Sequence, residues 1–175
     1  NNTEITDEIK ENIAKNKFPV EADFLTTINP IGTEDEIIKN NNLIASNERI
    51  SVQERLKAKN VAENFVQAII SIDKSKPEQA AERAKKYVVP EKKKEIEDLY
   101  IFLGKNQNEK AYLVDEISSY EEKNKEENDY VYFNVYTNAV AIDQYDQKVS
   151  FGRPTYNVQL LKLDGKWQVV QYNIN

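Results

Sequence analysis

SVQERLKAKNVAENFVQAIISI, residues 51–72, has the pattern of one long amphipathic helix, and it sets the fold of the chain. Its apolar residues lie mostly three and four positions apart, and they are Leu56, Ala58, Ala62, Phe65, Val66, Ile69, Ile70 and Ile72. Its polar residues are expected on the opposite, solvated side, and they include Glu54, Arg55, Lys57, Lys59, Glu63 and Gln67. Ser51 followed by Glu54 is a capping box, which predicts where the helix begins. The remaining elements must cover one face of this helix.

Residues 1–50 are rich in Asn, Thr, Asp and Glu and contain few large apolar side chains, which predicts an arm or linker with short pieces of helix. One piece is predicted from isoleucines spaced four apart, Ile5, Ile9 and Ile13. A second is predicted from Thr33 and Glu36, another capping box, and is expected to end at the Asn run over 40–42. We therefore expect one domain over residues 51–175 and an arm that has no face able to build a core.

Two further helices are expected before the first strand. PEQAAERAKKYVV, residues 77–89, has small and apolar residues at helical spacing, and Ser75 with Glu78 forms a capping pattern at its start. EKKKEIEDLYIFLG, residues 91–104, predicts a third helix with Gly104 as a left-handed stop. The apolar side of this helix is expected to hold Ile96, Leu99, Tyr100 and Leu103.

From Lys110 onward the apolar pattern has a period of two, which is typical of strands. Residues 111–120 predict a first long strand, residues 121–129 a charged tip, and residues 130–142 the strongest strand. In that strand the set expected to face the helices is Val131, Phe133, Val135, Thr137, Ala139 and Ala141. The set expected to face away is Tyr130, Tyr132, Asn134, Tyr136, Asn138, Val140 and Ile142.

The end of the chain predicts a β-hairpin. Asp164-Gly165 lies between two β-prone runs, and a type I′ turn needs residues that tolerate positive φ at both centres. With Leu163 opposite Lys166, one face of the hairpin would hold Leu160, Lys162, Trp167 and Val169. The other face would hold Leu161, Val170, Tyr172 and Ile174. Gly152 and Pro154 predict a bulge or irregular edge before the hairpin.

Composition excludes several kinds of chemistry. The chain has no Cys and no His, so thiol and serine–histidine nucleophiles, disulfides and the usual zinc sites cannot be built. Its formal net charge of −6 argues against a nucleic-acid partner, because phosphate binding needs concentrated Lys and Arg. Two acidic groups, residues 34–36 and Asp143 with Asp146, lack the ligand pattern of an EF-hand loop. We predict solvated turns there, and no metal or cofactor site.

The chain contains no Met, and no apolar run approaches the roughly 18 residues of a membrane-spanning helix. We therefore expect that residues preceding Asn1 have been removed, and that any membrane anchor lay among them. Whether that anchor is a helix or a lipid is left open.

The order of helices and strands predicts an α+β fold: three N-terminal helices packed on one face of a curved, mainly four-stranded antiparallel sheet, preceded by a partly helical arm. The closing hairpin is LLKLDGKWQVVQYNI, residues 160–174. Over about residues 51–175 this arrangement resembles the nuclear-transport-factor-two-like (cystatin-like) cone fold, many members of which carry an Asp-Gly-Lys-Trp turn near their end.

Within that superfamily, AENFVQAIISI (62–72) and AAERAKKYVVPE (80–91), with an Asn- and Lys-rich composition, make the chain similar to extracytoplasmic domains of Gram-positive conjugation proteins. These domains resemble the scaffold of type IV secretion systems, whose role is assembly. The resemblance implies a non-enzymatic scaffold or assembly domain of a membrane-anchored bacterial conjugative transfer protein. The implied location is the extracytoplasmic side of the cell membrane or the cell envelope. The implied partners are other protein subunits of a membrane assembly, with weak homo-oligomerisation.

Other classes stay open: a small-molecule-binding or isomerase-like cone domain, or a cell-envelope lipoprotein of another role. Some relatives of the fold catalyse isomerisation or dehydration with Asp, Tyr or His inside the cone. The candidates for such chemistry are Tyr100, Tyr112 and Asp115. Convergence of an Asp and a Tyr in a pocket would favour this class, whereas a cone filled by Phe65, Val66 and Ile69 would favour assembly.

Two surfaces are candidates for partner contact. Tyr130, Tyr132 and Tyr136 are expected on the face away from the helices, and tyrosine is enriched at interfaces. Anionic lipid or wall polymer could be contacted by a group of lysines, Lys85, Lys86, Lys92, Lys93 and Lys94. For the lysines, a solvated helix face is the competing interpretation.

Overall fold

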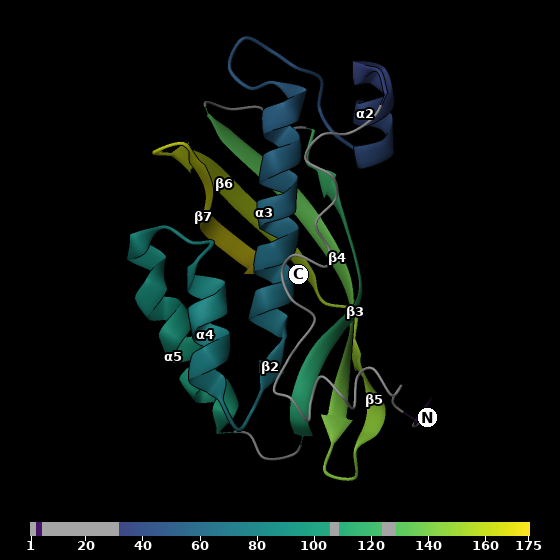
Figure 1. Cartoon of the computed structure of the whole chain (residues 1–175), viewed down its shortest axis with the longest axis vertical. Helices are drawn as coiled ribbons and strands as arrows, with labels where there is room; N and C mark the ends of the chain where they lie inside the picture. Colours follow the sequence, from purple (N-terminus) through teal and green to yellow (C-terminus); the bar gives the residue numbers. More distant parts are fainter. Residues whose placement is uncertain (1–2, 5–31, 106–108, 124–128) are drawn as a thin grey trace.

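The computed structural model describes residues 3–4, 32–105, 109–123 and 129–175, and it has the predicted α+β fold (Figure 1). A curled antiparallel sheet wraps around one long helix, and two shorter helices lie beside that helix (Figure 1). The short helix predicted around Ile5, Ile9 and Ile13 lies outside the described residues.

The described strands form one sheet in which the longest strand has three neighbours. The strands are β1 (Thr3–Glu4), β2 (Ile72–Asp73), β3 (Glu109–Glu121), β4 (Tyr130–Asp143), β5 (Gln147–Gly152), β6 (Thr155–Leu163) and β7 (Lys166–Ile174). The path β1-β5-β4-β3-β2 is joined by β6, which pairs with β4 and β7. The first half of β4 pairs with β6 and its second half pairs with β5, so β4 is where the sheet bends.

The helices are α2 (Glu34–Asn41), α3 (Val52–Ile70), α4 (Pro77–Lys85) and α5 (Lys93–Gly104), with a 3₁₀ turn over Pro90–Lys92. The central helix α3 begins as predicted, because the Ser51 hydroxyl accepts the backbone N–H of Glu54 at 3.2 Å. The predicted apolar side of α5 is confirmed, with Ile96 and Tyr100 fully buried.

Two predicted helix ends are wrong. Ser75 does not cap α4, because its hydroxyl and its backbone N–H are both held by the Asp73 carboxylate, and the N-cap position is Lys76. Gly104 does not stop α5 in a left-handed conformation. The helix includes Gly104, and the residue that caps it, Lys105, is right-handed with φ −82°.

The core lies between α3 and the concave face of the sheet, where Phe65 and Val66 are fully buried and Ile69 is almost so. The predicted solvated side of α3 is wrong for four of its residues. They are buried as deeply as the apolar ones, with 1–6% exposure, and they are Arg55, Lys59, Glu63 and Gln67. These residues repeat every four positions and so form one row along the helix. The row meets polar groups of β3, since Ser119 donates to Glu63 at 2.7 Å and Glu121 pairs with Arg55.

Residues 33–50 pack on the same core. Thr33 caps α2 as predicted, by accepting the N–H of Glu36 at 3.2 Å, and the left-handed Asn42 ends the helix. The sequence predicted no core contribution from this region. Contrary to that prediction, it contributes buried apolar residues, Ile37, Leu43 and Ile50. The boundary between an arm over 1–50 and a domain over 51–175 stays a prediction.

The alternation of β4 is confirmed, because the set predicted to face the helices is at most 6% exposed, from Val131 to Ala141. The exposure of the opposite set changes along the strand. Near its end, Val140 and Ile142 are buried with Ala111 and Leu113 in a second, smaller cluster. Near its start, the opposite set is partly or well exposed.

The closing hairpin has the predicted turn, with φ of 50° at Asp164 and 78° at Gly165, and Leu163 pairs with Lys166. The predicted facing of Tyr172 and Ile174 is wrong, and Ile174 pairs with the buried Tyr156. The register shifts by one residue after the Leu160–Val169 pair, so Tyr172 pairs with the buried Val158 and its ring meets Phe65 edge-on, 5.1 Å between centroids. A β-bulge inverts the facing of every residue that follows it.

Candidate interaction surfaces

An open hollow of about 360 Å³ lies where β3 ends and β4 continues. β3 ends at Glu121, opposite Phe133, whereas β4 starts at Tyr130. The segment between α2 and α3 crosses this place. The hollow is lined by Ile44, Asn47, Glu48, Arg49, Ile50, Arg55, Glu121, Glu122, Tyr130, Val131 and Tyr132.

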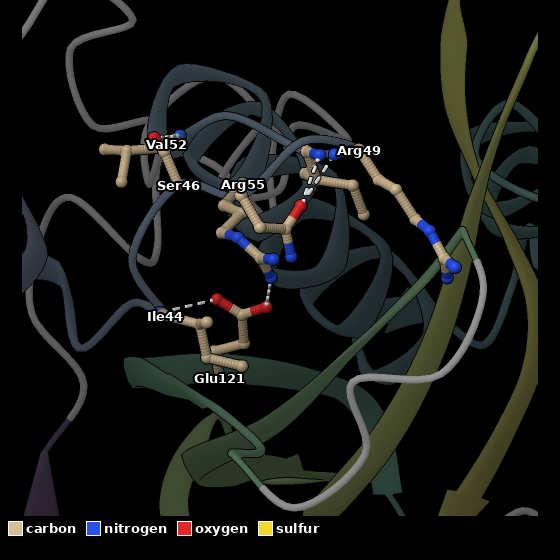
Figure 2. A network of polar contacts seen from close by, with 8 residues as sticks. Ile44, Ser46, Arg49, Val52, Arg55 and Glu121 are labelled. Atoms are coloured by element: carbon tan, nitrogen blue, oxygen red, sulfur yellow. Dashed lines mark hydrogen bonds and ion pairs between the residues drawn. The ribbon is translucent and has the colours of Figure 1, made fainter.

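The floor of this hollow is a buried ion pair between Arg55 of α3 and Glu121 of β3 (Figure 2). Their side chains are only 3% and 1% exposed. Glu121 also holds the segment that crosses the hollow, because its second carboxylate oxygen accepts the Ile44 N–H at 2.8 Å and its own N–H donates to the Asn42 carbonyl. One residue therefore joins the helix, the sheet and the connecting segment.

Short polar side chains fix the rest of that segment. The Asn47 carboxamide oxygen accepts the backbone N–H groups of Arg49 and Ile50, both at 2.8 Å, and the Ser46 hydroxyl accepts the Val52 N–H at 2.8 Å (Figure 2). Ile50 is buried beneath them. The Arg49 side chain points the other way, away from the Arg55–Glu121 pair (Figure 2).

A second hollow, of about 510 Å³, adjoins the first and shares Arg49 and Ile50 with it. Its other lining residues are Glu54, Asp129, Leu161, Lys162, Leu163, Gly165 and Trp167. The Trp167 indole N–H donates to Glu54 at 2.7 Å, and Lys162 pairs with the other oxygen of Glu54 at 3.1 Å. Burial raises the pKa of Glu54, but the hydrogen bonds from Trp167 and Lys162 and the charges of Lys57 and Lys162 together outweigh burial, so this pKa lies below its ordinary value.

The outer face of β3, β4, β6 and β7 carries few charges. Directly opposed residues of neighbouring strands share a face, so the outward set of β4 defines its partners on the other strands. Glu116, which lies opposite Asn138, marks one border of this set. We call the uncharged part of the set the neutral face: Ser118, Tyr120, Tyr130, Tyr132, Asn134, Tyr136, Thr155, Asn157, Gln159, Leu161, Gln168, Gln171 and Asn173. None of these is ionisable at neutral pH, although 31% of the chain is charged.

Within the neutral face, Asn157 donates to Asn134 and to Glu122, both at 2.9 Å. Tyr120 and Tyr136 form an edge-to-face pair with ring centroids 5.6 Å apart, and they are 48% and 46% exposed. The helices of the described part of the chain contact the opposite face, where Val131 and Phe133 are buried. Within the described part of the chain, the helices therefore leave the neutral face uncovered.

The predicted facing of Tyr130, Tyr132 and Tyr136 away from the helices is confirmed, and their contact with a partner stays a prediction. The three tyrosines do not line the same hollow. Tyr130 and Tyr132, with ring centroids 6.5 Å apart, line the first hollow. Tyr136 lines a separate hollow of about 480 Å³, which lies where β4 changes its partner from β5 to β6.

The candidate lysines lie on α4, on the 3₁₀ turn and on α5, and carboxylates accompany several of them. Lys85 bridges Glu82 and Glu97 at 2.7 and 2.5 Å, which raises the pKa of its ammonium and, through the Lys85 hydrogen bond, lowers the pKa of Glu82. Lys92 pairs with Glu95 and Lys94 with Asp98. Lys86 and Lys93 are exposed. Acidic neighbours leave little net positive charge in this group.

The candidates for isomerase-like chemistry do not converge. Tyr100 is fully buried and donates to the Ala68 carbonyl of α3, and this burial raises its pKa well above the ordinary range. Tyr112 accepts from Lys74 at 2.9 Å and stacks on Phe151. Asp115 is exposed near Lys148.

The acidic turns have ordinary structural partners. Asp143 accepts the N–H groups of Tyr145 and Gln147 within its own turn, and Asp146 pairs with Lys110 at 2.8 Å. Thr33 to Glu36 form the first turn of α2. Among the described residues, no three carboxylates gather as metal ligands would.

Sequence reasoning missed Arg55 and Glu121, and it did not single out Arg49. Arg55 was assigned to a solvated face and Glu121 to a charged tip, and the two lie 66 residues apart, so no local pattern links them. The only available signal was that Glu121 is the last position of an alternating strand, which places its side chain on the inner face.

The fold is shared with a known protein of low sequence similarity. An "Ntf2 like protein involved in plasmid conjugation" superposes with a TM-score of 0.52 at 17% identity, over 69% of this chain and 48% of that one, so the match spans about half of its length. A protein of unknown function with a cystatin-like fold from Nostoc punctiforme aligns at 12% identity over 72% of this chain and 92% of its own, with a TM-score of 0.48. The chain has an NTF2-like, cystatin-like cone fold.

No protein-family model and no curated protein sequence matches the chain. Among the described residues, no helix is long and apolar enough to cross a membrane.

Proposed function

We propose that this chain is a non-enzymatic assembly domain of a bacterial conjugative DNA-transfer apparatus, held on the extracytoplasmic side of the membrane and acting through protein contacts. The single observation that carries the proposal is the neutral face, an exposed sheet surface of Tyr, Asn and Gln on a chain of net charge −6. Like charges repel across an interface, so an uncharged surface is the one on which acidic subunits can meet. Likeness in fold to a plasmid-conjugation protein supports the setting.

The interior of the cone supports assembly over small-molecule chemistry. Phe65, Val66 and Ile69 fill the space between α3 and the sheet. Glu63 at that interface accepts from Lys59 at 2.6 Å and from Ser119 at 2.7 Å. Side chains packed and bonded in this way leave the outer surfaces as the sites where the domain can act.

A contact through the neutral face is expected to be weak for the isolated domain. One tyrosine buries about 150–250 Å², so a few tyrosines supply only part of the roughly 1,200 Å² of a stable interface. When many copies are confined to one membrane, a high effective concentration compensates for weak pairwise affinity. The domain is therefore expected to be monomeric in dilute solution and to assemble when anchored.

The proposal is tested by deleting the coding sequence in a strain that carries it and measuring DNA transfer to a recipient. Transfer is expected to fall sharply and to be restored by the wild-type chain supplied on a plasmid. Protease added to protoplasts, which lack the cell wall but keep an intact membrane, should degrade the domain while a cytoplasmic control protein survives. Normal transfer in the deletion strain would refute the proposed role, and protection from protease would refute the proposed location.

A further inference from the structure

The two hollows adjoin at Arg49 and Ile50, which line both, and we call the pair the groove. It runs from the end of β3, past the start of β4, to the β6–β7 hairpin. Polar and apolar residues line it in similar proportion, and the apolar ones include Ile50, Tyr130, Tyr132, Leu161 and Trp167. With volumes of about 360 and 510 Å³, each half has the size of a site for a small ligand or a few side chains.

The charges along the groove are not equivalent. Glu121 is bound by Arg55, Glu122 accepts from Asn157, and Glu54 accepts from Trp167 and Lys162. Those three carboxylates already have partners within the domain.

Arg49 differs from them. It is exposed, and among the described residues its guanidinium forms no ion pair. It lies at the junction of the two halves. Two more carboxylates line one half each, Glu48 the first and Asp129 the second. Among the described lining residues, Arg49 is therefore a cation that no ion pair within the domain neutralises.

The groove also contains the residue types that are typical of protein interfaces. Residues that dominate binding energy at protein interfaces are most often Trp, Tyr and Arg, set in a pocket with apolar surroundings. The groove holds Trp167, the only tryptophan of the chain, together with Tyr130, Tyr132 and Arg49. Its floor is held in place by the buried Arg55–Glu121 pair and by Asn47, so little ordering is needed on binding.

We infer that this groove binds an extended peptide segment of a partner protein, in which one acidic residue pairs with Arg49 and apolar residues on either side contact Tyr132 in one half and Leu161, beside Trp167, in the other. Arginine binds a carboxylate with two parallel hydrogen bonds, which fixes the position of the acidic residue. Glu48 and Asp129, which line one half each, repel further acidic residues. A run of many acidic residues is therefore a poor ligand, and a single one flanked by apolar residues is a good ligand.

This inference deepens the proposed function, since it names the chemistry of a partner segment, but its test does not depend on DNA transfer. A displayed library of random peptides is selected on the folded wild-type chain, on R49E and on R153E. Arg153 is an exposed arginine outside the groove, so R153E is the matched control for charge.

The wild-type chain and R153E are expected to enrich the same peptides, with one Asp or Glu between apolar residues. R49E should lose them and favour Lys or Arg at the central position. A synthetic peptide from the selection should change the fluorescence of Trp167, and its affinity should fall about tenfold or more for R49E and for the same peptide with the acid replaced by its amide.

Several results would overturn the inference: no enriched peptides, enriched peptides without a central acid, an R49E variant that binds as the wild type does, or a bound peptide that leaves Trp167 emission unchanged. Failure of the proposed role in DNA transfer, with peptide binding intact, would refute the proposed function and leave the groove inference standing. A confirmed role in DNA transfer with no peptide binding would refute the groove inference alone.

Discussion

Arg55 and Glu121 form an ion pair that is almost completely buried and that joins two elements 66 residues apart in the chain. Glu121 also binds the backbone of Ile44 and of Asn42. Buried charges are expensive to desolvate, so an ion pair of this kind persists only where the surrounding hydrogen bonds offset that cost. The pair holds the segment before α3 against the end of β3, and both outer surfaces of interest border it.

The first prediction concerns this pair. Glu121→Ala should lower the free energy of unfolding by about 3–5 kcal/mol, because it leaves the Arg55 guanidinium buried without its counter-charge. Urea denaturation followed by circular dichroism measures the change. Asp98→Ala, which removes a pair to Lys94 on the exposed side of α5, is the control and should have almost no effect. Equal stability of the two variants would mean that the Arg55–Glu121 pair does not hold the structure together.

The second prediction concerns the core. Phe65→Ala should cost about 3–5 kcal/mol, because Phe65 is fully buried and its ring packs edge-on against Tyr172. Phe102→Ala should change stability by no more than about 0.5 kcal/mol, since Phe102 is 72% exposed on α5. Chemical denaturation of both variants provides the comparison. A loss below about 1 kcal/mol for Phe65→Ala would place the ring outside the core.

The third prediction concerns alkaline pH. Burial raises the pKa of Tyr156 and of Tyr172 from 10.0 to about 12, with a smaller contribution from neighbouring charges. Between pH 10 and 12 the unfolded chain releases these phenol protons while the folded chain keeps them. The stability from the two groups is therefore complete below pH 10 and is lost as pH rises toward 12. Unfolding free energy should fall over this window, and Tyr156→Phe should make the fall shallower. Identical slopes for wild type and variant would contradict the assignment.

Local patterns in the sequence predicted the elements whose form depends on nearby residues. Ser51 with Glu54 marked the start of α3, and Asp164-Gly165 predicted the turn of the closing hairpin and its register as far as the Leu160–Val169 pair. The alternation of β4 predicted which residues are buried against α3. These features depend on hydrogen bonds and side-chain spacing within a few residues, so the sequence carries them directly.

Features that depend on distant residues could not be predicted in this way. The polar row of α3 has the spacing of a solvated face. Its burial is stabilised by polar groups of β3 across from it, those of Ser119 and Glu121. The shift of register at Val170 has no marker such as Gly, so the facing of Tyr172 was predicted wrongly. Ser75 does not cap α4, because Asp73 accepts both its backbone N–H and its hydroxyl.

The candidate surfaces were predicted only in part. The alternation of one strand identified Tyr130, Tyr132 and Tyr136, but the neutral face includes residues of four strands. Its extent depends on register between strands far apart in the chain. The groove depends on how the segment before α3 crosses the sheet, and Glu121 determines that crossing.

The central claim is that the neutral face is a working contact surface, and the most direct test is DNA transfer by a chain in which that face is charged. Tyr120→Lys with Tyr136→Lys is the suitable variant, because both rings are about half exposed and neither lines the groove. Tyr145→Lys, at an 84% exposed position in the β4–β5 turn, is the matched control. The double variant is expected to melt as the wild type does but to fail to restore DNA transfer in the deletion strain. The Tyr145→Lys control is expected to restore it. Full transfer by a folded double variant would contradict the claim.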